Sequence, residues 1–129
     1  MKVDQETNFV VVDKEASSLF SLIADGQYRN TTLGPEKWKG LIKEASLQEY
    51  CNKEGFNAVC GDDKKFYSKA RIGIVANQER DCNSCDSRMG FGTAGHYGGN
   101  NTCGNVADGT VQPDNGKKET QAMGFVFVQ

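Results

Sequence analysis

The sequence predicts an α+β domain in which strands and short helices are joined by long irregular loops. Three observations lead to this fold class. Apolar residues at three- and four-residue spacing mark two short helices in the first half of the chain. β-branched and alternating apolar runs mark strands from residue 9 to the C-terminal end. Residues 78–105 are rich in Gly, Asn, Asp and Cys, which indicates a long loop that disulfides tie down.

Length and composition bound the function. At 129 residues we expect one domain, residues 1–129. A hydrophobic content of 37% with 15 glycines predicts a modest core that disulfides or bound ions must support. A net charge of -2, with both signs spread along the chain, argues against a nucleic-acid surface. No apolar run is long enough to span a bilayer, and residues 1–6 are too polar for a secretion signal, so we expect any signal to lie outside this chain.

The first half of the chain carries one strand pattern and two helix patterns. The β-branched run at 9–12 predicts a buried strand. The spacing within 16–23 predicts a helix that Asp13 is placed to cap and Gly26 to end. A second helix is predicted over 35–45, with Pro35 in its first turn and Gly40 weakening it by about 1 kcal/mol. Capping-box spacing within 46–49 predicts a further helical turn.

The second half is predicted to supply most of the sheet, which we expect to be mixed but mostly antiparallel. Strand patterns occupy residues 55–60, 70–76, 89–92 and 122–128. Gly73 lies inside the second of these, which indicates a close backbone approach or a bulge. The closing run 122–128 is apolar on both faces, so it is predicted to be a central strand. Pro113 and Gly116 bound a turn.

Cysteine usage indicates an oxidising compartment. The five cysteines are Cys51, Cys60, Cys82, Cys85 and Cys103, and an odd number leaves one unpaired. Cys82-Asn83-Ser84-Cys85 has three interpretations: a zinc site completed from Cys60, His96 and Cys103, a redox dithiol, or two cysteines that each form a structural disulfide elsewhere. We favour structural disulfides. Glycosylation sequons at Asn30 and Asn100 agree with a secreted origin.

The same loop is rich in the hard oxygen donors that calcium prefers. Ca²⁺ takes six to eight oxygens from carboxylates, amides, backbone carbonyls and water. The candidate donors are Asp81, Asn83, Asp86, Asn100, Asn101 and Asn105. His96 and Tyr97 lie among glycines, where an exposed aromatic ring beside such an ion would suit stacking on a sugar. Because no nucleophile elbow, phosphate loop or carboxylate pair accompanies this histidine, we expect no enzymatic activity.

Six stretches resemble one family across almost the whole chain. Two lie in the first half, Ser-Leu-Phe-Ser-Leu-Ile-Ala-Asp-Gly at 18–26 and Lys-Trp-Lys-Gly-Leu-Ile at 37–42. The other four are Ala-Arg-Ile-Gly-Ile-Val-Ala-Asn at 70–77, Asp-Cys-Asn-Ser-Cys-Asp-Ser-Arg-Met-Gly-Phe-Gly-Thr at 81–93, Asn-Thr-Cys-Gly-Asn at 101–105 and Ala-Met-Gly-Phe-Val-Phe-Val at 122–128. Together they resemble the C-terminal half of the intelectin-like, fibrinogen-related domains of secreted invertebrate proteins. The resemblance implies a fibrinogen-like fold and a calcium-dependent lectin that binds exocyclic vicinal diols of microbial sugars.

The resemblance also implies roles for individual residues. It pairs Cys51 with Cys82, which leaves Cys60 and Cys85 as a second pair, and it pairs the cysteine matching Cys103 with an upstream half of the domain. Asn83 and Asn105 match positions of the family's calcium site, and Asp86 lies beside them; we predict all three as metal ligands, with His96 and Tyr97 contacting the ligand.

The chain departs from the family where the sugar is held. The segment between Cys82 and Cys85 is shorter and lacks the family's Glu-His, and residues 105–116 lack the two aromatics that cradle the sugar. The sequence therefore predicts a secreted recognition domain with glycan partners, and, as the alternative, an extracellular-matrix module that binds protein and no sugar.

Overall fold

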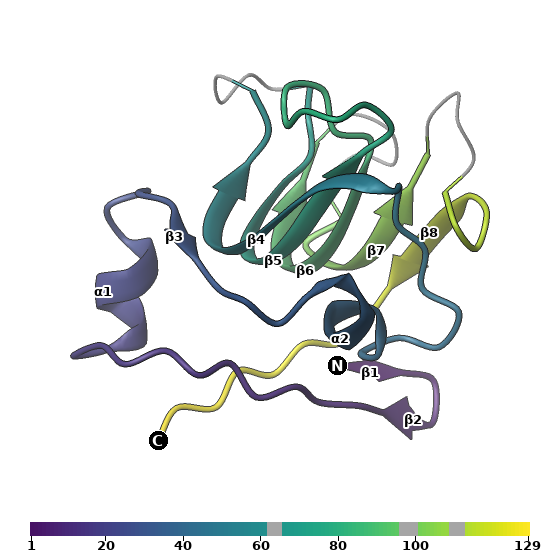
Figure 1. Ribbon diagram of the computed structural model, residues 1–129. Coiled ribbons are helices and arrows are strands. Elements are labelled where there is room, and N and C mark those ends of the chain that lie inside the picture. Colours follow the sequence, from purple (N-terminus) through teal and green to yellow (C-terminus); the bar gives the residue numbers. More distant parts are fainter. Residues whose placement is uncertain (62–65, 96–100, 109–112) are drawn as a thin grey trace.

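The computed structural model describes residues 1–61, 66–95, 101–108 and 113–129. Its main strands are β3 (Arg29–Asn30), β4 (Tyr50–Val59), β5 (Lys69–Asn77), β6 (Ser87–Ala94), β7 (Cys103–Ala107) and β8 (Lys118–Gln121). They form one six-stranded sheet in chain order, and every neighbouring pair is antiparallel (Figure 1). A separate small hairpin pairs β1 (Lys2–Val3) with β2 (Glu6–Thr7).

The α+β prediction was wrong, because the described chain is mainly β. Strands hold 37% of the described residues and helices only 9%. The helices are α1 (Leu19–Ile23) and α2 (Pro35–Lys39), and both lie on one side of the sheet (Figure 1). The helical spacing in the sequence marks them correctly, but each is five residues long, so together they cannot build a helical layer.

Local capping explains why both helices are so short. Ser18, rather than Asp13, caps α1: its side chain accepts a hydrogen bond from the Ser21 backbone N–H at 3.1 Å. Gly40 is the C-cap of α2. The helical turn predicted over 46–49 does not form, because the Ser46 backbone N–H and carbonyl oxygen bond instead to the side-chain amide of Asn105.

A row of four glycines crosses the centre of the sheet. Gly55 is paired with Gly73, Gly73 with Gly90, and Gly90 with Gly104. A Cβ atom at Gly73 would overlap the Met89 carbonyl oxygen on β6, and each of the other three glycines would meet a neighbouring strand in the same way. The close approach predicted at Gly73 is confirmed. The row also explains why much of the glycine-rich stretch 78–105, predicted as a loop with only a short strand at 89–92, forms β6 and β7.

The main hydrophobic core lies between the sheet and the helices. Ile72, Ile74 and Ala76 of β5 point into it, as their alternation in the sequence predicts, while Val75 belongs to a second cluster. Trp38 of α2 is fully buried there and donates its indole N–H to the Glu54 carboxylate. Because the backbone N–H of Gly34, the N-cap of α2, donates to the same carboxylate at 3.0 Å, this buried carboxylate has two polar partners at α2.

The two runs nearest the ends of the chain contradict their predictions. Residues 9–12 were predicted to be a buried strand and residues 122–128 a central strand, but neither run is a strand in the structure. In the first, Val10 and Val12 pack on the core while Phe9 and Val11 are exposed. In the second, only a single bridge between Lys2 and Met123 pairs the chain. A central strand needs a neighbour on each side along its whole length, whereas in 122–128 only the first two residues bond to neighbouring backbone of the described chain.

The chain next to β8 is held by a turn that the sequence predicted. The Gly116 backbone N–H donates to the Pro113 carbonyl oxygen at 3.0 Å, with Gly116 at positive φ. Asp114 accepts the Leu47 N–H at 2.9 Å and forms an ion pair with Lys39 of α2. The turn therefore fastens the sheet edge to the helical side of the molecule. Among the described residues, no helix has the length and apolar character needed to cross a membrane.

Candidate functional site

The candidate site is the corner of the sheet where two disulfides hold the loop between β5 and β6. Cys51, at the start of β4, is bonded to Cys82 in the loop, and Cys60, just after β4, is bonded to Cys85, just before β6. These are the two pairs that the family resemblance implied. Both ends of the Cys82–Cys85 segment are therefore covalently fastened to the two ends of one long strand.

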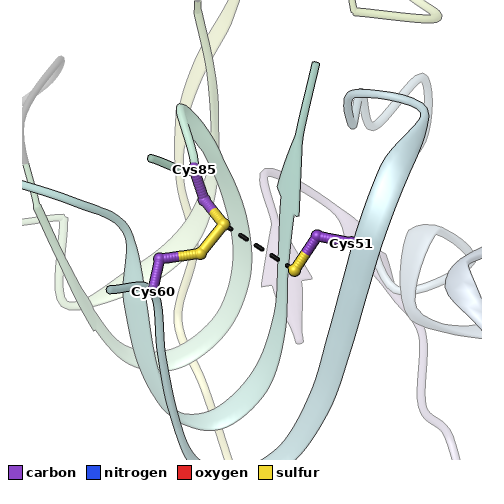
Figure 2. A group of neighbouring side chains, drawn as sticks. All are labelled: Cys51, Cys60 and Cys85. Atoms are coloured by element: carbon purple, nitrogen blue, oxygen red, sulfur yellow. Dashed lines mark hydrogen bonds between the residues drawn. A yellow bond between two sulfur atoms is a disulfide. The ribbon is translucent and has the colours of Figure 1, made fainter. Parts of the chain in front are cut away.

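The four half-cystines form one compact cluster. The sulfur atoms of Cys51, Cys60 and Cys85 lie within 4.8 Å of one another, and those of Cys51 and Cys85 are 3.8 Å apart (Figure 2). Ala58 and Val75 complete this second hydrophobic cluster, on which Tyr67 packs. The arrangement is buried and apolar at Cys60 and Cys85, so it serves as a small core that positions the loop above it.

The zinc interpretation of the Cys82–Cys85 motif does not fit this arrangement. Zinc needs deprotonated thiols, and all four clustered sulfurs are used in disulfides. Cys103, one of the expected additional ligands, packs instead against the main core. His96, the other, lies outside the described residues. Among the residues that the structure describes, the cysteine cluster is the one grouping of three or more His, Cys, Asp or Glu side chains close enough to share an ion.

Hydrogen bonds that Asn77 donates and Asp81 accepts shape the loop itself. The buried amide of Asn77, at the end of β5, donates to the Asp81 carbonyl oxygen at 2.9 Å and to its carboxylate at 3.2 Å. The same carboxylate accepts the Asn83 backbone N–H at 2.9 Å. Ser84 donates its hydroxyl to the Glu79 carboxylate at 3.0 Å. The loop therefore collects carboxylate and amide oxygens within a few residues of the disulfides.

The three predicted calcium ligands are only partly brought together. Asn83 is exposed at the tip of the loop, and Asp86 is half-buried at its end, where its backbone N–H donates to the Gln48 side chain at 3.2 Å. Asn105 is fully buried on β7 and opposes Met89 in the sheet register. Because Met89 is three residues along the chain from Asp86, the backbones of Asp86 and Asn105 are separated by about 10 Å along the strand.

The Asn105 side chain is already committed to the backbone. Its oxygen accepts the Ser46 N–H at 2.8 Å, and its NH₂ group donates to the Ser46 carbonyl at 2.9 Å and to the Arg88 carbonyl at 3.0 Å. These bonds join the loop before β4 to β6 and β7. The structure thus places Asn105 as a structural amide of the core, apart from the exposed oxygens of the loop.

The remaining predicted site residues fall in two groups. His96 and Tyr97, predicted to contact the ligand, and Asn100 of the second sequon lie outside the described residues. Cys103, predicted to be unpaired within this chain, is the free cysteine of the structure. It is half-buried at the start of β7, and this burial raises the pKa of its thiol above the ordinary value.

Sequence reasoning missed a buried cation beside the site. Arg88 on β6 is fully buried, and its guanidinium donates to the Ser68 hydroxyl at 3.4 Å. Desolvation lowers its pKa to about 10. The Ser68 backbone bonds both Cys85, through its N–H at 3.1 Å, and Cys60, through its carbonyl at 3.2 Å, so the arginine is linked to the cysteine cluster through one residue. The sequence signal that could have found it was a single charged residue within 87–91, a stretch that also contains Met89 and Phe91.

Comparisons with known proteins do not help to interpret this geometry. A scan against family models, a search of curated proteins and a search of solved structures each found no match to this chain. A function must therefore be inferred from the residues of the chain itself, their arrangement and the resemblance of its motifs.

Proposed function

We propose that this chain is a secreted, non-enzymatic recognition domain that binds carbohydrate through a calcium ion held at the loop between β5 and β6. One observation carries the proposal: the exposed Asn83 lies next to the Asp81 carboxylate in a segment whose two cysteines are both bonded to the ends of β4. Disulfides are typical of secreted proteins. The exposed Asn30, in the first sequon, adds weaker support.

Calcium chemistry suits the donors of this loop. Ca²⁺ accepts carboxylate, amide and carbonyl oxygens in flexible geometry, so a loop can supply several ligands without a rigid cage. Asp81 and Asp86 offer negative charge, and Asn83 offers an amide oxygen. Vicinal hydroxyls of a sugar would complete the coordination, as in the family that the sequence resembles. His96 and Tyr97, which lie outside the described residues, are the side chains predicted from the sequence to contact the sugar.

Calcium titration by calorimetry tests the metal part of this proposal. Thermal unfolding is measured in parallel with calcium and with chelator, because an ion that binds only the folded state stabilises it by about 2.7 kcal/mol at a hundredfold excess over its Kd. Asp86→Asn and Asn83→Ala should each weaken calcium binding. Asp4→Asn, in the exposed turn between β1 and β2, removes an equal charge elsewhere and should not.

A glycan array tests the carbohydrate part. Binding to glycans with exocyclic vicinal diols should appear in calcium and disappear in chelator. The proposal fails if the chain takes up no calcium and retains no glycan. Calcium uptake without glycan binding would retain the metal site and remove the lectin function.

The second candidate function is an extracellular-matrix module that binds protein and no sugar. The specific observation in its favour is the set of large apolar side chains left exposed near the two ends of the chain, from Phe9 to Phe20 and from Met123 to Val128. Such exposure is typical of surfaces that contact other proteins. This alternative predicts binding to immobilised matrix proteins that chelator does not change.

A further inference from the structure

The closing segment of the chain has the apolar pattern of a central strand, but most of its backbone pairs with no neighbouring strand of the described chain. Residues 122–128 are apolar on both faces, a pattern that strands buried on two sides show. In the structure only its first two residues are paired: the Ala122 N–H donates to the Cys103 carbonyl at 2.9 Å, and Met123 exchanges bonds with Lys2 at 2.8 and 2.9 Å. From residue 124 onward the segment belongs to no strand.

The N-terminal run begins close to this segment, because the Asn8 N–H donates to the Met1 carbonyl oxygen at 2.9 Å and the next residue after Met1, Lys2, is paired with Met123. We name as the terminal apolar strip the residues Phe9, Val11, Met123, Phe125, Val126, Phe127 and Val128, which are 45–88% exposed. Both runs lie on the side of the sheet that carries the helices (Figure 1). The rings of Phe125 and Phe127 are stacked with centroids 6.4 Å apart, so alternate side chains of the closing segment share one face, as in a strand.

The size of the strip matches what a stable dimer needs. Taking roughly 170 Å² for a fully exposed side chain of this kind, its seven members expose roughly 800 Å² of apolar surface. The largest apolar patch of a typical monomer is only about 300–600 Å². A standard protein–protein interface takes about 800 Å² from each partner. The strip is therefore large enough to form the core of a specific interface.

The electrostatics of the closing segment allow it to pair with itself. No side chain from Ala122 to Gln129 is charged. Two copies aligned antiparallel about a two-fold axis would therefore place no like-charged side chains opposite one another along the ladder. Its start is fixed, because Gly124 packs directly against the Cys103 sulfur and the Phe91 ring, where a Cβ would overlap both.

We propose that a second copy of this chain covers the terminal apolar strip, by antiparallel pairing of residues 124–128 with the same residues of the partner. The pairing gives the backbone N–H and carbonyl groups of this segment a ladder partner and buries the stacked Phe125 and Phe127. The interface is isologous, so it closes at two chains. This inference does not depend on carbohydrate or calcium binding. It concerns the same surface as the matrix-module alternative and assigns that surface a different partner.

Sedimentation equilibrium across a concentration series, with chelator present, tests the proposal. The wild-type chain should reach twice the 14.1 kDa of one chain. The double variant Phe125→Asp, Phe127→Asp places four carboxylates at the two-fold contact and should stay at the mass of one chain. Phe66→Asp, which changes an exposed aromatic that is not part of the strip, should dimerise like the wild type. Thermal unfolding of the three proteins shows whether each is folded.

Three outcomes would overturn the proposal. The wild type could stay at 14.1 kDa at every concentration, the double variant could dimerise as well as the wild type, or the wild type could form an open series of larger species instead of a closed pair. A monomeric wild type that nevertheless binds matrix proteins would assign the strip to the structural-module function. Because chelator is present throughout, a failure of calcium or glycan binding has no effect on this result.

Discussion

Removing the two disulfides singly and together would measure how strongly the candidate loop is held. Cys51–Cys82 closes a loop with a sequence separation of 31 residues and Cys60–Cys85 one of 25. In the chain-entropy model, loops of these lengths stabilise the fold by about 3.7 and about 3.5 kcal/mol when each is the first bond to form. The two bonds are not independent, however, because Cys60 lies inside the first loop and Cys85 outside it.

The interlocked loops change the expected energies. With Cys51–Cys82 intact, the covalent path from Cys60 to Cys85 runs nine residues back to Cys51, crosses the bond and continues three residues from Cys82. The second bond then closes an effective loop of about 12 residues and contributes about 2.8 kcal/mol. With Cys60–Cys85 intact, the covalent path from Cys51 to Cys82 has the same length. Each single removal should therefore cost about 2.8 kcal/mol and the double removal about 6.4 kcal/mol, an excess of about 0.8 kcal/mol over additivity.

Urea unfolding followed by tryptophan fluorescence is the appropriate assay. Trp38, the one tryptophan of the chain, is fully buried beside the Glu54 carboxylate, so its emission should report loss of the core. The cysteines are changed in pairs to alanine, which introduces no hydroxyl into the apolar cluster. The total loss is comparable with the whole stability of an ordinary domain, about 5–15 kcal/mol, so the variant lacking both bonds should populate the unfolded state in buffer.

A control and two refuting results complete the experiment. Cys103→Ala removes a free thiol and closes no loop, so it should leave the loop contribution unchanged. Single removals that cost less than about 1 kcal/mol would refute the view that these bonds hold the loop. A double removal that costs less than the sum of the single removals would refute the interlocked-loop model.

Two further predictions follow from the sheet and from the turn beside β8. Gly73→Ala should lower the free energy of unfolding by more than the roughly 1–3 kcal/mol usual for overpacking, because the new Cβ meets a carbonyl oxygen of the neighbouring strand, which cannot move aside. Urea unfolding measures the loss. Gly26→Ala is the comparison, because its Cβ would meet open space, although Gly26 has positive φ. Burial raises the pKa of Asp114, but hydrogen bonds from Lys39 and the Leu47 N–H outweigh it, so the folded-state pKa lies below the ordinary value of 3.8. The ion pair should therefore stabilise the fold above about pH 4 and lose this effect as the pH falls through the folded-state pKa of Asp114. Urea midpoints measured from pH 6 to about pH 2 should show this loss of stability in the wild type, and Asp114→Asn should make it smaller.

The strands that the sequence predicted correctly are those whose pattern is set by local contacts in the sheet. Residues 55–60 and 70–76 lie almost wholly within β4 and β5, and 89–92 lies within β6. Their alternation is visible in the sequence because one face packs against the core. The glycine-rich stretch was harder, because Gly90 and Gly104 are typical of loops when considered singly. Their meaning depends on the glycine opposite each of them, which only the register supplies.

The fold class failed for a different physical reason. Periodicity correctly locates an apolar face in residues 16–23 and 35–45, but it does not state how much of that face the tertiary structure uses. Caps at Ser18 and Gly40 and the competing amide of Asn105 end or prevent helix at each boundary. For the site, the cysteine pairs implied by the resemblance are present, whereas the split between exposed Asn83 and buried Asn105 could be known only from the register of β6 and β7.

The two ends of the chain carry the most informative disagreement between sequence and structure. The apolar pattern of a segment indicates how much of its surface could be buried. The structure shows how much of that surface the described chain does bury. Where the two agree, as in β5, the neighbours lie in the same chain. Where they differ, as in the segment from Phe125 to Val128, the pattern still requires neighbours, and the hydrophobic effect on the exposed side chains acts on whatever surface can supply them. The disagreement therefore locates an interface, and a second copy, which carries the same uncharged edge, is the partner whose chemistry matches it.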